Sequence, residues 1–174
     1  MSIEIQRAVD RTPQPWKNGL GVQYEITCDG SLPDDWTWRL STADITQDVP
    51  FSIFPEVNRE FCVADGNGVV LTINGVEHRC ESGSITKFRG DDEVYATLID
   101  GPMKALNLMV RDGESPIHLC RQDTEGLLAV IAIGEMQVFK SDGLQFRLDV
   151  LDAVLTKSKR FPIDSVCDQL IFVA

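Results

Sequence analysis

The chain of 174 residues is 43% hydrophobic, enough to bury the core of one domain or of two small halves that pack together. Its 27 acidic residues outnumber its 16 lysines and arginines, and the resulting net charge of -11 repels phosphate backbones and anionic lipids. We therefore expect neither nucleic acid nor a membrane as a partner. The N-terminal residues lack a signal-peptide pattern, and the longest apolar run, at 127–133, is too short to span a bilayer. The sequence thus predicts a cytoplasmic protein.

Two segments near the N-terminus alternate between polar and apolar residues, which is the pattern of β-strands. They are VQYEITC at residues 22–28 and WTWRLSTA at residues 36–43. The alternation of the second segment predicts two faces, one with Trp36, Trp38 and Leu40 and the other with Thr37, Arg39 and Ser41.

The clearest turn signal is Asn74-Gly75, which separates two alternating runs within residues 69–80. Asn-Gly supplies the positive φ angles of a two-residue type I′ turn, so we predict a β-hairpin here. Further strand-like runs are EVYATLI, ALNLMV, LLAVIAI, MQVFK, LQFRLDVL and QLIFVA. No segment has a convincing helical pattern. About a dozen short strands with tight turns predict an all-β fold, a sandwich or a barrel.

A weak internal echo suggests that the chain has two related halves. Residues 69–88 and 135–157 both read as a strand, a turn that contains glycine, a second strand and a polar corner before a third strand. We therefore predict two jelly-roll-like barrels packed as one unit, the first over residues 1–112 and the second over 113–174. The second barrel is small, and N-terminal strands could complete it.

The histidines and cysteines give little support for a metal centre. His78 with Cys80, and His118 with Cys120, could each form half of a zinc site, but the H-x-H pattern of metal-binding barrels is missing. We expect no metal and no cofactor. The five cysteines are widely spaced and contain no C-x-x-C pair, so we interpret them as reduced, buried residues: Cys28, Cys62, Cys80, Cys120 and Cys167. Neither histidine lies in a recognisable nucleophile context.

A cluster of polar residues is the best candidate site. Lys17 and Asn18 lie in a glycine-flanked turn, Glu25 on the polar face of the next strand, and Arg39 with Ser41 on that of the following one. If these faces line the barrel interior, the cluster suits a carboxylate, because arginine is a two-pronged donor and lysine a point charge. The alternative is that the faces point to solvent, since alternation does not say which face is inside.

Residues 50–60, PFSIFPEVNRE, add aromatic residues and a further cation to this candidate site. Phe51 and Phe54 either pack beneath the segment or form a wall of a pocket. Arg59 either enters the pocket or pairs with an acid on the surface. In the preceding turn, PWKNGLG, we expect Trp16 to anchor a pocket entrance at which Gly19 and Gly21 let the backbone approach a ligand.

The order and spacing of PWKNGLGVQYEI, WRLSTADI, PFSIFPEVNRE and KFRGDDEVYATLIDGPMKALNLMVR resemble the HutD/Ves family over most of residues 10–111. The resemblance implies a bicupin without a catalytic metal. It also implies functional roles at Trp16, Lys17, Asn18, Gly19, Gly21, Glu25, Arg39, Ser41, Phe51, Phe54, Pro55 and Arg59. The chain departs from the family pattern at Leu20, at Gln23-Tyr24, where the family shows Thr-Arg, at Pro55-Glu56 in place of Pro-Gly, and at Asn58-Arg59 in place of Asp-Arg.

Three functions are compatible with these residues. The family's association with histidine utilisation favours a metal-free protein that binds a small anionic carboxylate, such as a formyl or formimino glutamate, in a sensing or regulatory role. The first alternative is a metal-independent enzyme acting on a small amide or carboxylate, with Glu25 as the general base and Lys17 or Arg39 as the electrophilic stabiliser. The second is an assembly protein, a homodimer for example, in which Trp36 and Trp38 pack against a second chain.

Overall fold

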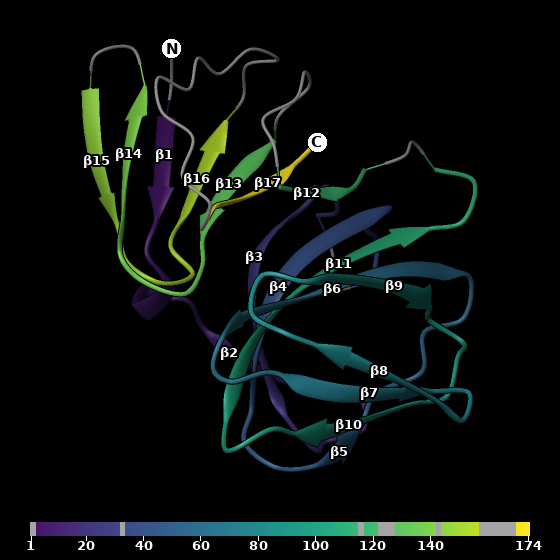
Figure 1. Ribbon diagram of the computed structural model, residues 1–174. Coiled ribbons are helices and arrows are strands. Elements are labelled where there is room, and N and C mark those ends of the chain that lie inside the picture. Colours follow the sequence, from purple (N-terminus) through teal and green to yellow (C-terminus); the bar gives the residue numbers. More distant parts are fainter. Residues whose placement is uncertain (1–2, 32–33, 115–116, 122–127, 142–143, 157–169) are drawn as a thin grey trace. The chain divides into compact units, whose positions relative to one another are not determined.

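A computed structural model describes residues 3–31, 34–114, 117–121, 128–141, 144–156 and 170–174. The chain divides into two compact units (Figure 1). The large unit is Thr12–Pro116, and the split unit combines Met1–Arg11 with Ile117–Ala174. The division after residue 116 lies close to the predicted border at 112/113. The first eleven residues, however, belong with the C-terminal part of the chain.

The large unit contains two antiparallel sheets. The six-stranded sheet has the order β2 (Pro13–Pro15), β3 (Val22–Cys28), β4 (Trp38–Ile45), β11 (Met103–Arg111), β6 (Val57–Asp65) and β9 (Ile85–Arg89). The four-stranded sheet has the order β5 (Val49–Pro50), β10 (Val94–Leu98), β7 (Val69–Ile73) and β8 (Val76–Cys80).

The core of the large unit lies between these two sheets. Phe61 and Val63 of β6 pack in one cluster with Val69 and Leu71 of β7, all of them fully buried. Side chains that alternate along β4, β11 and β6 therefore point either into this core or away from it. In β4 the inward set includes Arg39 and Ser41, both of which are buried.

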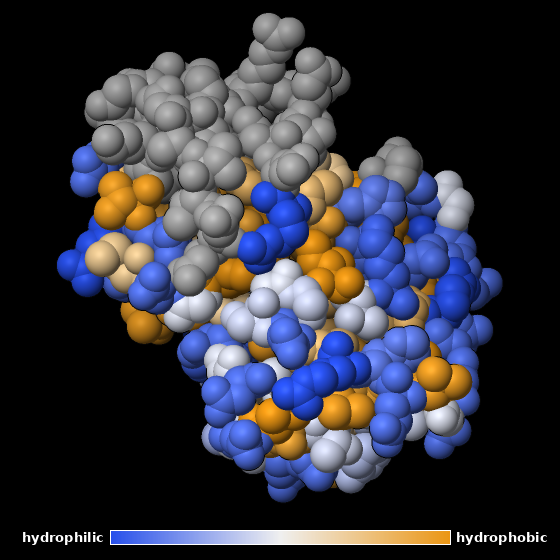
Figure 2. All heavy atoms as spheres, in the orientation of Figure 1, coloured by the Kyte–Doolittle hydropathy of each residue, from blue (hydrophilic) through white to orange (hydrophobic). Residues whose placement is uncertain are grey.

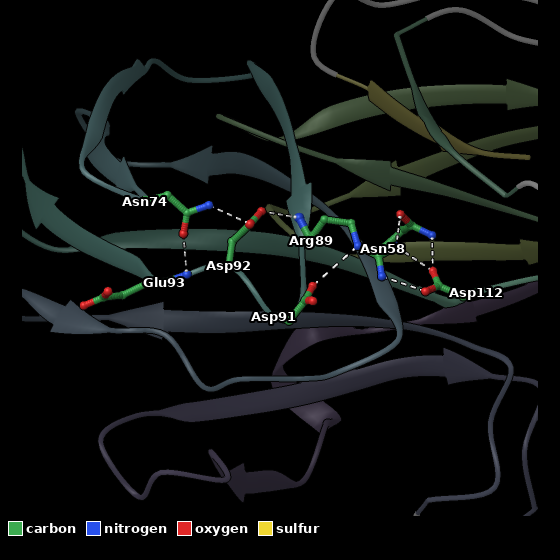
Figure 3. A network of polar contacts seen from close by, with 7 residues as sticks. All are labelled: Asn58, Asn74, Arg89, Asp91, Asp92, Glu93 and Asp112. Atoms are coloured by element: carbon green, nitrogen blue, oxygen red, sulfur yellow. Dashed lines mark hydrogen bonds and ion pairs between the residues drawn. The ribbon is translucent and has the colours of Figure 1, made fainter.

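The turn at Asn74-Gly75 confirms the predicted hairpin. Both residues have positive φ angles, +48° and +84°, and Ile73 pairs with Val76 across the turn. The Asn74 side chain also binds the segment before β10, donating to Asp92 Oδ1 (2.7 Å) and accepting from the Glu93 amide (3.0 Å) (Figure 3).

Arg89 continues this network at the end of β9. Its backbone amide donates to Asp92 Oδ2 (2.7 Å), and its guanidinium forms two bonds of 2.6 Å to the Asp112 carboxylate (Figure 3). These hydrogen bonds raise the pKa of Arg89, and the same bonds lower the pKa of Asp112. The network fixes the connection between the two sheets.

The split unit has a five-stranded antiparallel sheet and a hairpin. The sheet order is β1 (Ile3–Gln6), β16 (Ala153–Thr156), β13 (Ala129–Ala132), β17 (Leu170–Val173) and β12 (Leu119–Cys120), and the hairpin joins β14 (Gln137–Ser141) to β15 (Leu144–Leu148). A short 3-10 helix (Ala8–Asp10) follows β1. N-terminal β1 thus pairs with a strand near the C-terminus.

The buried Asp152 carboxylate attaches the N-terminal segment to the rest of the split unit. Its oxygens accept from the Ala8 amide (2.8 Å), the Asp149 amide (2.9 Å) and Arg7 Nη1 (2.6 Å). Arg11 is buried nearby, and its guanidinium donates to Gln6 Oε1 and to the Leu151 carbonyl, both at 2.7 Å. Every oxygen of this carboxylate therefore has a partner, as expected of a structural network.

The all-β prediction is confirmed, since the described residues contain strands and a single 3-10 turn. The strand pairings form open sheets, so the closed barrels that we predicted are not observed. The predicted face of Trp36 is wrong, because β4 begins only at Trp38. Trp36 packs beside Arg39 instead of opposite to it and is buried in its own chain.

On the face drawn in Figure 2, hydrophilic side chains predominate, and hydrophobic ones occur in small groups between them. Within the described ranges, no helix is long and apolar enough to cross a membrane.

Candidate functional site

The large unit contains a cavity on the inner side of its six-stranded sheet. The cavity is small, and its empty volume of about 390 Å³ includes open solvent at its mouth. Its lining combines aromatic rings with a few polar groups: Trp16, Lys17, Gln23, Ala43, Ile45, Phe51, Ser52, Phe54, Arg59, Asn107 and Met109.

Arg59 is the central polar group of this cavity. The strand register places it beside Met109 of β11 and Phe88 of β9, and only 6% of its surface is exposed. Its Cζ lies 5.0 Å from the ring centroid of Phe88, 5.3 Å from that of Phe51 and 5.6 Å from that of Phe54. Three aromatic rings therefore surround the guanidinium, each close enough for a cation–π interaction.

The hydrogen bonds of Arg59 are long and incomplete. Nη1 donates to the Ser52 carbonyl (3.2 Å), Nη2 donates to Asn107 Oδ1 (3.4 Å), and the buried Nε has no partner. Within the described part of the chain, no carboxylate lies within ion-pair distance of Arg59. A buried charge is normally paired, and the described residues supply no such partner for Arg59.

Arg39 adds a second buried cation next to the cavity. Burial lowers the pKa of Arg59 to about 10, and the charge of Arg39 contributes to that shift. Burial also lowers the pKa of Arg39, while Glu25 acts in the opposite direction. The Nε of Arg39 is buried without a partner, and its Nη2 donates to Gln23 Oε1 (3.1 Å). Both arginines remain protonated at neutral pH, which makes the cavity electropositive despite the acidic chain.

The two amide side chains of the cavity are oriented by the arginines. Arginine can only donate, so Gln23 and Asn107 must turn their oxygens toward Arg39 and Arg59. Their amide nitrogens make no hydrogen bond to any described residue. The free donors of the cavity are thus two amide NH2 groups, Arg59 Nε and the Lys17 ammonium, which lies 5.7 Å from the Phe54 ring centroid.

The turn at residues 16–21 forms one wall of the cavity and is fastened to residues 50–52. Asn18 Nδ2 donates to the Pro50 carbonyl (3.1 Å), and the Asn18 amide donates to Ser52 Oγ (3.3 Å). The Trp16 ring packs edge-on against Phe51, with 5.9 Å between centroids. This packing orients Trp16 toward the cavity.

The glycines of this turn have different structural roles. A Cβ on Gly21 would lie 2.7 Å from two ring atoms of Trp16, so this glycine makes room for the indole. Gly19 has φ of +72° and open space around it, so its backbone conformation is the reason for glycine. We had expected both positions to make room for a ligand, and at Gly21 the space is taken by Trp16.

The structure brings together only part of the site proposed from the sequence. Trp16, Lys17, Phe51, Phe54 and Arg59 line the cavity, whereas Asn18, Gly19, Gly21, Glu25, Arg39 and Ser41 do not. Arg39 does not line the cavity but donates a hydrogen bond to Gln23, which does. Asn18 holds the turn at residues 16–21 against Pro50 by a hydrogen bond. The Glu25 carboxylate accepts from Cys28 Sγ (3.6 Å), and Ser41 is buried between the strands of Glu25 and Asn107.

Gln23, Ser52, Asn107 and Met109 were not identified from the sequence. Gln23 has the same strand parity as Glu25, and Asn107 is a polar residue within the apolar run ALNLMV; both were usable signals. Of the cysteines, Cys62 and Cys80 are buried as expected, and Cys28 and Cys120 are half-buried; Cys167 lies outside the described residues. In the same described ranges, no group of three or more His, Cys, Asp or Glu side chains could hold a metal ion.

The chain is an all-β protein whose neighbours among solved structures are cupin-like. HutD from Pseudomonas fluorescens SBW25 superposes with a TM-score of 0.79 and 29% identity, over 99% of this chain and 97% of that one. Escherichia coli Ylba, with a TM-score of 0.66 and 8% identity, shares the fold alone. The sequence profile of HutD matches residues 8–168, so the chain belongs to the HutD family.

Relatives at the sequence level match a shorter region. Protein Ves of Citrobacter koseri is 38% identical over 98 residues, covering 55% of this chain and 51% of that protein. The "Uncharacterized 21.2 kDa protein in hutC 3'region" of Pseudomonas putida is 36% identical over 109 residues, covering 62% and 57%. The chain thus spans about half the length of the curated relatives it matches.

Proposed function

We propose that the chain binds a small carboxylate metabolite, without a metal, and that Arg59 anchors the carboxylate. The observation that carries this proposal is a buried guanidinium, enclosed by three aromatic rings, that lacks a carboxylate partner among the described residues. A ligand carboxylate could accept from Nε and replace the long bond to Asn107. Its negative charge would then pair with the guanidinium.

The composition of the cavity supports an acceptor-rich ligand. Its lining includes an arginine, a lysine and two amide side chains, all of which can donate, and no carboxylate side chain lines it. Its size favours a metabolite of a few heavy atoms or one end of a longer molecule. Family membership and the hutC-region relative support a role in histidine utilisation. We therefore propose a cytoplasmic sensor or regulator of an intermediate such as a formyl or formimino glutamate, built as a bicupin.

The two alternatives receive less support from the same geometry. Glu25, the base of the enzyme alternative, does not line the cavity and contacts Cys28 instead. Trp36, half of the assembly surface, is 4% exposed and packs against Arg39 and Arg111 of its own chain. Binding alone therefore accounts best for the cavity.

Thermal unfolding with added ligand tests the proposal. Acetate, N-formylglutamate and N-formiminoglutamate are compared at millimolar concentration on the wild type, on Arg59→Met and on the matched control Arg79→Met, whose side chain is 61% exposed on β8. We expect at least one acid to raise the Tm of the wild type and of Arg79→Met, but not of Arg59→Met. A wild type that no acid stabilises, or an Arg59→Met variant that responds equally, would contradict the proposal.

A further inference from the structure

Resting on the proposed function, we propose that Gln23 is a specificity-determining residue. It selects carboxylates that carry a neutral hydrogen-bond acceptor, a keto or amide oxygen, in addition to the carboxylate bound by Arg59. Gln23 lines the same cavity as Arg59 but extends from β3, three strands away from β6 in the sheet. The two side chains therefore approach a ligand from different sides.

A hydrogen bond from Arg39 fixes the orientation of the Gln23 amide. Its oxygen accepts from Arg39 Nη2 at 3.1 Å, and arginine offers no acceptor that would tolerate the reverse orientation. The amide nitrogen is therefore turned away from Arg39, and it has no partner among the described residues. Arg39 is itself buried, so the donor is held in place before any ligand arrives.

The chemistry of this donor differs from that of Arg59. The NH2 group is neutral, so it adds no charge to the site, but it forms a full hydrogen bond with a carbonyl oxygen. A hydrocarbon at the same place would leave the NH2 group unpaired in a cavity lined by Ile45, Phe51 and Met109. Sites with such donors reject analogues that lack the acceptor, because the protein group is then left unpaired.

Pairs of ligands that differ only by this acceptor test the inference. Pyruvate and methacrylate share a planar shape and a carboxylate, but methacrylate has a CH2 group in place of the keto oxygen. In the second pair, 4-oxopentanoate and 4-methyl-4-pentenoate, the keto oxygen and the CH2 group that replaces it lie farther from the carboxylate. Calorimetry gives the ratio of the two Kd values within each pair. For the wild type we expect at least one pair to favour the keto acid by about 3- to 10-fold.

Variants at Gln23 then separate direct recognition from a purely structural role. Gln23→Met removes the donor and Gln23→Glu keeps an acceptor for Arg39 but has no NH2 group, so we expect the ratio to fall to about 1 in both. Gln145→Met, an exposed position on β15, should keep the wild-type ratio. A ratio near 1 in the wild type for both pairs, or a ratio unchanged in Gln23→Met, would overturn the inference.

The outcome also distinguishes this inference from the proposed function. Suppose that the wild type binds both acids of each pair equally well and that Arg59→Met loses affinity for them. This result would support carboxylate binding at Arg59 and exclude the specificity role of Gln23. If Gln23→Met weakens both acids of a pair equally, Gln23 acts only by holding Arg39, and the specificity role is likewise excluded. If no acid binds the wild type, both proposals fail together.

Discussion

Arg11 in the split unit and Arg59 in the large unit allow a comparison of a structural cation with a cation that we propose binds a ligand. The two arginines are similarly buried, and burial lowers the pKa of each to about 10. Arg11 makes two bonds of 2.7 Å and has the Asp152 carboxylate close enough to oppose the shift. Arg59 makes bonds of 3.2 and 3.4 Å, and its charged neighbour is another arginine.

This comparison shows that burial and a shifted pKa do not identify a site by themselves. The surroundings decide: Arg11 has a buried Nη1 without a partner, but it donates two hydrogen bonds of 2.7 Å and has the Asp152 carboxylate nearby, whereas Arg59 faces a cavity with aromatic walls. Incomplete charge compensation beside open space is the sign of a ligand site. Four predictions test this difference.

The largest effect is expected at Asp152. Asp152→Ala leaves two backbone amides without acceptors and removes the compensating charge beside Arg7 and Arg11. Removing this buried carboxylate, the acceptor of three hydrogen bonds, should lower the free energy of unfolding by about 3–5 kcal/mol, measured by urea denaturation. Asp149→Ala, whose side chain is 65% exposed, is the control and should change it by less than about 0.5 kcal/mol. Equal effects of the two variants would refute the structural network.

Replacing each arginine by methionine should change the stability of the protein in different ways. Arg11→Met leaves Gln6 Oε1 and the Leu151 carbonyl unpaired, so the free energy of unfolding should fall by about 1–3 kcal/mol. Arg59→Met removes a poorly compensated charge from an apolar cage and should be neutral or stabilising in the absence of ligand. The same denaturation measurement decides, and an Arg59→Met variant that loses as much stability as Arg11→Met would contradict the account.

Substitutions in the turn that forms one wall of the cavity should have effects no larger than that of Arg11→Met. Gly21→Ala places a Cβ against the Trp16 ring, so we expect the ring to move, stability to fall by about 1–3 kcal/mol and carboxylate affinity to fall with it. Gly19→Ala meets no atoms but must adopt φ of +72°, which should cost about 1 kcal/mol in stability and leave affinity unchanged. Calorimetry on both variants measures this, and equal affinities would show that Trp16 does not shape the site.

The smallest expected effect is that of pH on binding. The pKa of Arg59, lowered to about 10, still lies well above neutrality, and carboxylic acids ionise near pH 4, so affinity should stay constant between about pH 6 and pH 9. Only as pH rises through the pKa of Arg59 is the binding form of the guanidinium lost. A titration step near neutral pH in calorimetry would point to another group as the anchor.

Much of the fold follows from the sequence, because strand periodicity and the Asn74-Gly75 turn are local signals. The site follows less completely. Periodicity suggested Arg39 as a pocket residue, but only the register with β11 shows that its face points inward and that Gln23 lies between it and the cavity. The face of Trp36 was wrong because alternation was extended beyond the start of β4. The direction of the Glu25 carboxylate depends on tertiary contacts that periodicity does not encode.

We propose that Arg59, and not Arg11, binds a carboxylate. The most direct measurement is a titration with acetate that follows the arginine Nε–Hε signals by 15N-edited NMR, with each signal assigned by its loss in the corresponding methionine variant. The Nε of Arg59 has no partner among the described residues, whereas that of Arg11 donates to Gln6. We predict a saturable shift of the Arg59 signal and none of the Arg11 signal. An Arg59 signal that does not move, or that moves no more than that of Arg11, would contradict the account.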